Sequence, residues 1–214
     1  MGEPTPALED RLRQQDAEAL AELFTANRER LRCIIRFRMD SRVVGRLDPE
    51  DVLQEAYLAA TQRLAHFATS GLSPFGWLRI VALQALADIH RQHVGAQRRS
   101  VERERPGQIR IGANTSALMA SRFLGHLTSP SQAAARAEVF QMLELAIESM
   151  DELDREVLAL RHFEELGNLE IAEALGIQPK AASIRYVRAL RRLRELLARI
   201  PGLAGELPDA SRSD

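Results

Sequence analysis

The sequence predicts an all-helical protein with two small domains. Alanine, leucine, arginine and glutamate dominate the 214 residues, and all four are good helix formers. No long alternating stretch rich in valine, isoleucine and threonine indicates a sheet. Apolar residues recur instead at helical spacing, and this pattern decays between residues 97 and 130. We therefore expect helical domains at 1–96 and 131–200, a flexible linker at 97–130 and a disordered tail at 201–214.

The composition excludes several kinds of protein. The formal net charge is −1, so any cationic surface is local. Cys33 is the only cysteine, which excludes an intramolecular disulfide and a cysteine-based structural metal site. Residues 1–10 have neither the apolar core nor the basic flank of a secretory signal, and no apolar run approaches membrane-spanning length. We therefore expect a cytoplasmic protein without membrane insertion.

Two helices are expected at the start of the chain, from about Pro6 to Thr25 and from about Asn27 to Phe37. Each has apolar residues along one face. Five arginines occupy the other side of the second helix. They could form a nucleic-acid face, but a solvated flank is the preferred interpretation because most runs of charge are simply hydrated.

A third helix is expected at about residues 48–67, because an aspartate cap followed by proline starts it. Asp51, Gln54 and Glu55 recur at i, i+3 and i+4 and therefore form one polar patch. A catalytic or metal-binding carboxylate pair is disfavoured, since no histidine or third carboxylate joins them at ligand spacing. A docking patch for a basic partner is the simpler interpretation.

A fourth helix follows the Ser-Pro break at residues 73–74. Its first half is apolar over a wide face, and its end is strongly basic, with Arg91, Arg98 and Arg99. Trp77, the only tryptophan, lies just inside this helix. It is either a core residue or, because a basic helix is close, a stacking platform for an unpaired base.

The C-terminal domain is expected to hold four helices. A short apolar segment near residues 118–127 indicates one weak helix within the linker, and two longer helices follow, at about 131–150 and 151–163. Residues 166–197 then predict a closely spaced helix pair, which completes the four.

The helix pair at 166–197 has the pattern of a DNA-binding motif. Gly176 provides the backbone freedom of a sharp corner, and Pro179 fits the first position of the second helix. One face of that second helix is apolar, and much of the rest is cationic. These features favour a helix-turn-helix that lays its second helix in the DNA major groove. A solvated basic helix in an ordinary bundle is the alternative.

No constellation of residues indicates catalysis or metal binding. The chain has no glycine-rich phosphate loop, no Gly-x-Ser-x-Gly elbow and no His-Glu-x-x-His. His90 and His93 are three residues apart, and solvated or phosphate-facing histidines are preferred over metal ligands. We expect no enzyme activity, no cofactor and no metal site.

Two separated blocks resemble one family, the bacterial RNA polymerase sigma factors of the sigma-70 class, in their compact two-domain extracytoplasmic-function (ECF) type. In the first block, residues 47–55 are similar to the family's acidic D-D-x-x-Q-E segment, which docks on the clamp helices of the polymerase's largest subunit. Residues 77–91 look like the segment that melts and reads the minus-ten element. The second block, at 132–197, resembles the domain whose helix-turn-helix reads the minus-thirty-five element.

The resemblance implies a sigma factor that directs core RNA polymerase to specific promoters and promotes DNA melting. Its partners are then core RNA polymerase and promoter DNA, and the presence of an anti-sigma factor is left open. Three sets of contact residues follow from the matching positions. They are Asp51, Gln54 and Glu55 for polymerase; Trp77, Gln84, Asp88, Arg91, Arg98 and Arg99 for the minus-ten element and melting; and Lys180, Ser183, Arg185 and Arg188 for the minus-thirty-five element.

Three positions depart from the family pattern. Gln84 stands where asparagine is usual, Gly167 where a capping serine is usual, and Ala181-Ala182 where threonine-valine is usual. The glycine is expected to weaken its helix by about a few tenths of a kcal/mol. Two other functions stay open. One is a stand-alone helix-turn-helix repressor or activator, which would bind a palindrome without polymerase, and the other is a helical adaptor that binds only proteins.

Overall fold

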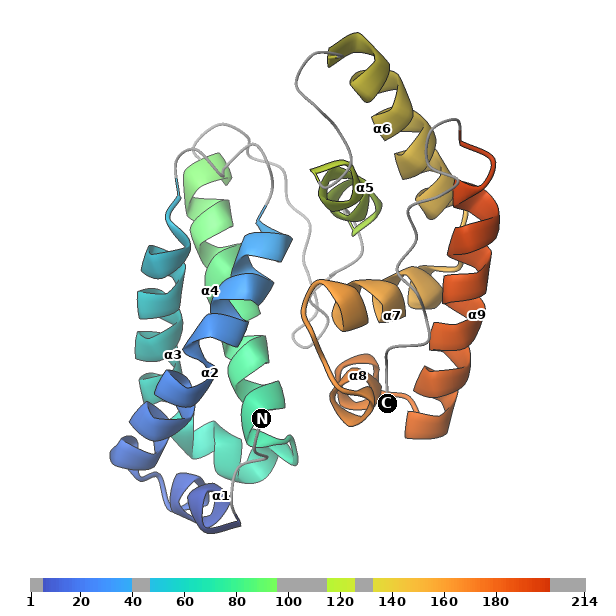
Figure 1. The fold of residues 1–214 in the computed structure, drawn as a ribbon. Helices are drawn as coiled ribbons and strands as arrows, with labels where there is room; N and C mark the ends of the chain where they lie inside the picture. Colours follow the sequence, from blue (N-terminus) through green and yellow to red (C-terminus); the bar gives the residue numbers. More distant parts are fainter. Residues whose placement is uncertain (1–5, 40–46, 96–114, 126–132, 201–214) are drawn as a thin grey trace. The chain divides into compact units, whose positions relative to one another are not determined.

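The structure, a computed structural model, describes residues 6–39, 47–95, 115–125 and 133–200. Within these ranges it contains nine helices and no strand, which confirms the predicted all-helical class (Figure 1). The helices are α1 (Pro6–Arg13), α2 (Ala17–Arg38), α3 (Pro49–Ser70), α4 (Pro74–Gly95), α5 (Thr115–Gly125), α6 (Ala133–Glu148), α7 (Glu152–His162), α8 (Asn168–Leu175) and α9 (Pro179–Leu197). They fall into two compact units, with α1–α4 in the first and α5–α9 in the second.

The first unit is a bundle in which α2 packs on α3 and α4, α3 and α4 pack on each other, and α1 contacts α2 and α3. Gly71 ends α3 in the left-handed region, at φ +67°, and Pro74 begins α4 after a short turn. The core is made of aliphatic and aromatic side chains from all four helices. Among those that are fully or almost fully buried are Leu12, Leu20, Ile34, Ile35, Leu53, Phe67 and Leu78.

The break between α1 and α2 lies at residues 14–16, so the predicted break at 25–27 is wrong. Asp16 Oδ1 accepts hydrogen bonds from the backbone N–H groups of the second and third residues of α2, at 2.8 and 3.3 Å. Gln15 takes a left-handed conformation, at φ +63°. Arg11 Nε donates to Asp16 Oδ2 at 2.7 Å and lowers the pKa of that carboxyl. These local bonds end α1, although the apolar pattern continues past the break.

In the second unit, α5 packs against α6 and α7, and α9 packs against α6, α7 and α8. Helix α5 lies within the span predicted as the linker, where one weak helix is expected. Thr115 Oγ1 donates to Glu156 Oε2 of α7 at 3.1 Å, and both residues are buried. Met119 and Leu124 of α5 are buried as well. The described part of that span is therefore a packed helix of the second unit.

Over the residues that the structure describes, no helix combines the length and the apolar character needed to cross a bilayer. The same residues include no cluster of three or more histidine, cysteine, aspartate or glutamate side chains that could hold a metal ion.

Candidate DNA interface

The turn between α8 and α9 is determined by backbone geometry and by one asparagine. Gly176 ends α8 at φ +63°, a conformation that other residues rarely adopt, and its N–H donates to the Glu173 carbonyl at 3.2 Å. Pro179 begins α9. Asn168 joins the two helix starts, because its Nδ2 donates to the Pro179 carbonyl at 3.0 Å and its Oδ1 accepts from Ser183 Oγ at 3.1 Å. Helices α8 and α9 therefore form a helix-turn-helix.

Gly167 is the N-cap residue of α8 and forms only half of a capping box. Glu170 Oε2 accepts a hydrogen bond from the Gly167 N–H at 2.7 Å, but a glycine has no side chain to cap the first turn in return. A Cβ at residue 167 would lie 3.5 Å from Glu170 Oε2, which is ordinary van der Waals contact. A serine would therefore fit at residue 167, and crowding does not require a glycine there.

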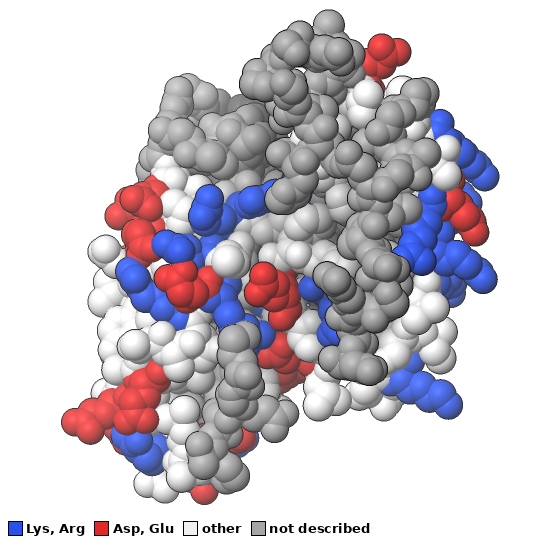
Figure 2. Space-filling view, in the orientation of Figure 1, with Lys and Arg blue, Asp and Glu red and all other residues white. Residues whose placement is uncertain are grey.

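Helix α9 buries one side and exposes the other. Its buried side chains are all apolar, namely Ala182, Ala189, Leu190, Leu193, Leu196 and Leu197. Lys180, Ile184, Val187 and Arg191 recur at i, i+4, i+7 and i+11 and lie on the opposite side, which we call the outer face of α9. Figure 2 shows lysine and arginine side chains gathered along this edge of the second unit. Ile184 and Val187 are 57% and 67% exposed and were not predicted as contacts, although helical spacing places them outward.

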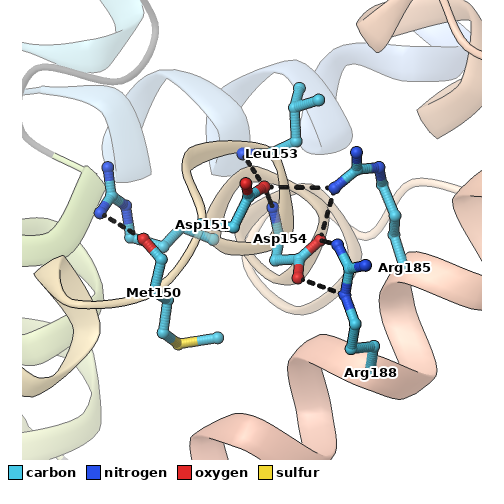
Figure 3. Close-up of polar contacts among 7 residues, drawn as sticks. Met150, Asp151, Leu153, Asp154, Arg185 and Arg188 are labelled. Carbon is cyan, nitrogen blue, oxygen red and sulfur yellow. Dashed lines mark hydrogen bonds and ion pairs between the residues drawn. The ribbon is translucent and has the colours of Figure 1, made fainter.

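Two of the predicted groove contacts, Arg185 and Arg188, are held against α7 by aspartates (Figure 3). Arg188 Nε and Nη2 donate to the two carboxylate oxygens of Asp154, both at 2.8 Å, which makes a bidentate pair. Arg185 Nη1 donates to Asp154 Oδ1 at 2.8 Å and to Asp151 Oδ1 at 3.2 Å. The Asp154 side chain is only 8% exposed, so the two arginines neutralise an almost buried carboxylate. We call these four residues the arginine–aspartate cluster.

The position of Asp154 at the start of α7 adds to its stabilisation. It lies in the first helical turn, where the helix dipole favours a negative charge, and Asp151 caps the same turn by accepting from the Leu153 N–H at 3.1 Å. Burial raises the pKa of the Asp154 carboxyl, but the hydrogen bonds and charges of Arg188 and Arg185 outweigh it and leave the pKa below its ordinary value. The hydrogen bond to Asp154 raises the pKa of Arg188 in turn. Asp154 is therefore ionised at neutral pH.

The cluster gives both arginines a structural role that was not predicted. The Arg185 side chain is 27% exposed and that of Arg188 is 51% exposed. A guanidinium has five N–H donors, and the bidentate pair uses two of those of Arg188. Arg188 can therefore still reach a phosphate, whereas Arg185 acts mainly as a link between α9 and α7.

The predicted polymerase patch lies on the exposed side of α3. Asp51, Gln54 and Glu55 are all exposed and share one face of the helix, as their spacing predicts. Within the described residues neither acid of this patch forms an ion pair, whereas the neighbouring Glu50 pairs with arginines of α2. Leu58 is 54% exposed, continues the same face and was not predicted.

Trp77 is a core residue, which corrects the prediction of a base-stacking platform. Its side chain is 5% exposed, and its ring centroid lies 5.3 Å from that of Phe67. Val81, one turn further along α4, is equally buried, so this face of the helix points into the bundle. A buried indole has no open face on which a base can stack. We therefore remove Trp77 from the proposed DNA contacts.

Trp77→Phe is accordingly expected to leave promoter opening unchanged and to lower the free energy of unfolding by about 1–2 kcal/mol, through lost packing alone. Permanganate reactivity of unpaired thymines in the complex with core polymerase measures opening, and thermal denaturation measures stability. Phe67→Leu is the matched control, because it disturbs the same packing from α3. Reduced opening by the tryptophan variant alone, at a temperature where both variants are folded, would restore Trp77 to the DNA contacts.

The other predicted minus-ten residues lie on or beyond α4. Gln84 Oε1 accepts a hydrogen bond from Arg63 Nη1 of α3 at 2.6 Å. Asp88 and Arg91 form an ion pair one turn apart, and their side chains are 45% and 65% exposed. Arg98 and Arg99 lie outside the described residues.

The geometry of α8 and α9 is that of the helix-turn-helix class, which many DNA-binding domains share. Residues 140–193, which run from α6 to α9, match the family described as Sigma-70, region 4. This part of the second unit is therefore similar to a sigma-70 region 4, which confirms the predicted resemblance to the sigma-70 class over this segment.

No curated protein matches the chain. A solved structure described as "Structure of CnrH in complex with the cytosolic domain of CnrY" aligns with 89% of this chain and 95% of that chain, at 21% identity and a TM-score of 0.47. A TM-score this low supports no conclusion about fold, partner or function.

Proposed function

We propose that the chain is an RNA polymerase sigma factor of the ECF type, which brings core polymerase to specific promoters and helps to melt them. The observation that carries this proposal is the sigma-70 region 4 match over a helix-turn-helix whose outer face carries the cations Lys180 and Arg191. A separate first unit with an exposed acidic patch on α3 supports it. Such a protein acts in the cytoplasm, where polymerase and promoters are, and leaves the chemistry of RNA synthesis to the polymerase.

The proposed polymerase contacts are Asp51, Gln54 and Glu55, to which we add Leu58. Two carboxylates that have no ion-pair partner within the described residues favour a basic partner surface. An exposed leucine beside them suits the apolar centre that protein interfaces usually have. The α3 face thus provides both charge complementarity and apolar area for core polymerase.

The proposed DNA contacts fall into two groups. For the minus-ten element we retain Gln84, Asp88, Arg91, Arg98 and Arg99, without Trp77. For the minus-thirty-five element we retain Lys180, Ser183 and Arg188, add Arg191 from the outer face, and assign Arg185 to support. The Arg191 side chain is 78% exposed and lies 4.0 Å from its nearest acid, Glu195, so it can turn towards a phosphate with little loss.

Run-off transcription with purified core polymerase on a pooled promoter library tests the proposal. We expect discrete transcripts only when the chain and core polymerase are both present. Tight binding of the chain alone to a palindrome would instead identify a stand-alone repressor or activator. Polymerase binding without any promoter preference, unchanged when Arg188 and Lys180 are both neutralised, would identify an adaptor.

The phosphate contacts make a separate prediction. Lys180→Gln combined with Arg191→Gln is expected to weaken promoter binding by the holoenzyme similarly on all promoters. It is also expected to reduce the slope of log K against log salt concentration by about 2, because two phosphate-neutralising charges are lost. Fluorescence anisotropy across a salt series measures both. Arg199→Gln, an exposed arginine beyond the end of α9, is the control. A slope equal to that of the parent would refute the assignment.

A further inference from the structure

The middle of the outer face of α9 is aliphatic rather than polar. Ile184 and Val187 lie between two cations, Lys180 and Arg191, on one side of the helix. With more than half of each side chain exposed, neither contributes to the core of the second unit. Both are β-branched and therefore rigid at χ1, so each presents a defined methyl surface.

The two cations are separated by more than the width of a DNA major groove. Lys180 and Arg191 are separated by about 16 Å along the helix axis, at about 1.5 Å per residue. The major groove is about 12 Å wide. If the helix crosses that groove with its outer face inward, its two ends reach beyond the groove edges, and the flexible side chains of Lys180 and Arg191 can turn to the phosphates of the two strands. Ile184 and Val187 would then face the base edges.

The polar side chains near this pair are engaged within the protein. Arg185 and Arg188 are hydrogen-bonded to Asp154, and Ser183 Oγ is hydrogen-bonded to Asn168. The two side chains that point most directly outward at the centre of the helix, Ile184 and Val187, are aliphatic and form no hydrogen bonds. In the major groove, the base-edge group that an aliphatic side chain can recognise is the 5-methyl of thymine.

We propose that Ile184 and Val187 read promoter sequence by packing against thymine methyl groups in the major groove. This inference rests on the proposed function and names the residues that give it sequence preference. Lys180 and Arg191 position the helix through phosphates, and the aliphatic pair selects among base pairs. An exposed apolar pair could also bind a protein or a second copy of this chain, and the experiment distinguishes these occupants.

The test replaces thymine by deoxyuracil, which removes only the methyl group. A promoter selected by the holoenzyme is synthesised with single replacements through its upstream element, and binding is measured for each. We expect at least one position at which the parent holoenzyme loses about fourfold in affinity per methyl. The Ile184→Ala, Val187→Ala variant is expected to bind thymine and deoxyuracil duplexes equally well. Leu145→Ala truncates an equally exposed aliphatic side chain on α6 and should retain the fourfold preference for thymine over deoxyuracil.

The outcomes separate the inference from the proposed function. If the parent transcribes from thymine promoters but is indifferent to deoxyuracil, the inference fails and the sigma factor proposal stands. If the double variant keeps the full thymine preference, other residues read the methyl groups and the inference fails. If the variant instead loses self-association or binding of a protein partner, with its thymine preference intact, the pair is a protein contact. If no holoenzyme forms, both proposals fail. Because both side chains are exposed, the variant is expected to fold, and circular dichroism checks this.

Discussion

Replacing Asp51 and Gln54 together by alanine is expected to abolish transcription by removing core-polymerase binding, while the fold stays intact. Both side chains are exposed on α3. If each acts as an interface hot spot worth about 2 kcal/mol, their joint loss weakens binding about 1,000-fold. The fold should lose far less, since Asp51 contributes to stability mainly through the dipole of the first turn of α3, at about 0.3–1 kcal/mol.

Affinity for core polymerase by fluorescence anisotropy, together with thermal denaturation of the free chain, measures the two expected effects separately. The matched control is Gln14→Ala with Glu18→Ala, an equally exposed glutamine and acid at the α1–α2 corner. The control should bind core polymerase like the parent. Parent-like affinity of the α3 variant would show that the polymerase docks elsewhere. A loss shared by both variants would indicate a general charge effect instead of a defined patch.

Asp154→Asn is expected to destabilise the packing of α9 on α7 by about 2–3 kcal/mol at neutral pH. The substitution removes the charge that holds Arg185 and Arg188, and hydrogen bonds to charged groups contribute about 1.5–3 kcal/mol. The expected loss of stability is smaller than the loss on breaking a fully buried ion pair, because the side chain of Arg188 is half exposed and can turn to water. Hydrogen exchange of the α9 amides in the intact chain measures this local stability.

The pH dependence of this effect has a definite sign. The folded-state pKa of Asp154 is lowered, so its ionisation stabilises the fold fully above the unfolded-state pKa of about 3.9. That contribution is lost as the pH falls through the lower, folded-state pKa. The difference in protection between the parent and Asp154→Asn should therefore be largest near pH 7 and shrink in acid. A difference that stayed constant down to pH 2 would exclude ionisation of Asp154 as its source.

Asp151→Asn is the control for the same experiment. Asp151 is mostly exposed, contacts Arg185 at 3.2 Å, and caps α7 through a side-chain oxygen that asparagine also has. We expect Asp151→Asn to lower the local stability of α9 by less than about 1 kcal/mol. Equal losses from the two substitutions would mean that general charge at the start of α7 matters, and that the bidentate pair of Asp154 does not.

Features that depend on neighbours within one or two helical turns were predictable. The helix-turn-helix follows from Gly176 and Pro179, and the start of α3 follows from Asp48, whose carboxylate accepts from the Glu50 N–H at 2.9 Å. The shared exposed face of Asp51, Gln54 and Glu55 follows from helical spacing alone. The α1–α2 break was also local, but its cap at Asp16 lies inside a continuous apolar pattern and was overlooked.

By itself, the sequence determined that this protein is helical, where most of its helices begin, and that α9 has an apolar side and a cationic side, because these properties repeat every three or four residues. Only the tertiary structure decided what each polar side chain meets. Asp154 lies 31 and 34 residues before the arginines it binds, and Trp77 packs on a ring of another helix. Helical periodicity does not specify such distant partners, so two arginines with a DNA-binding pattern proved to support the fold, and two aliphatic residues were left on the outer face.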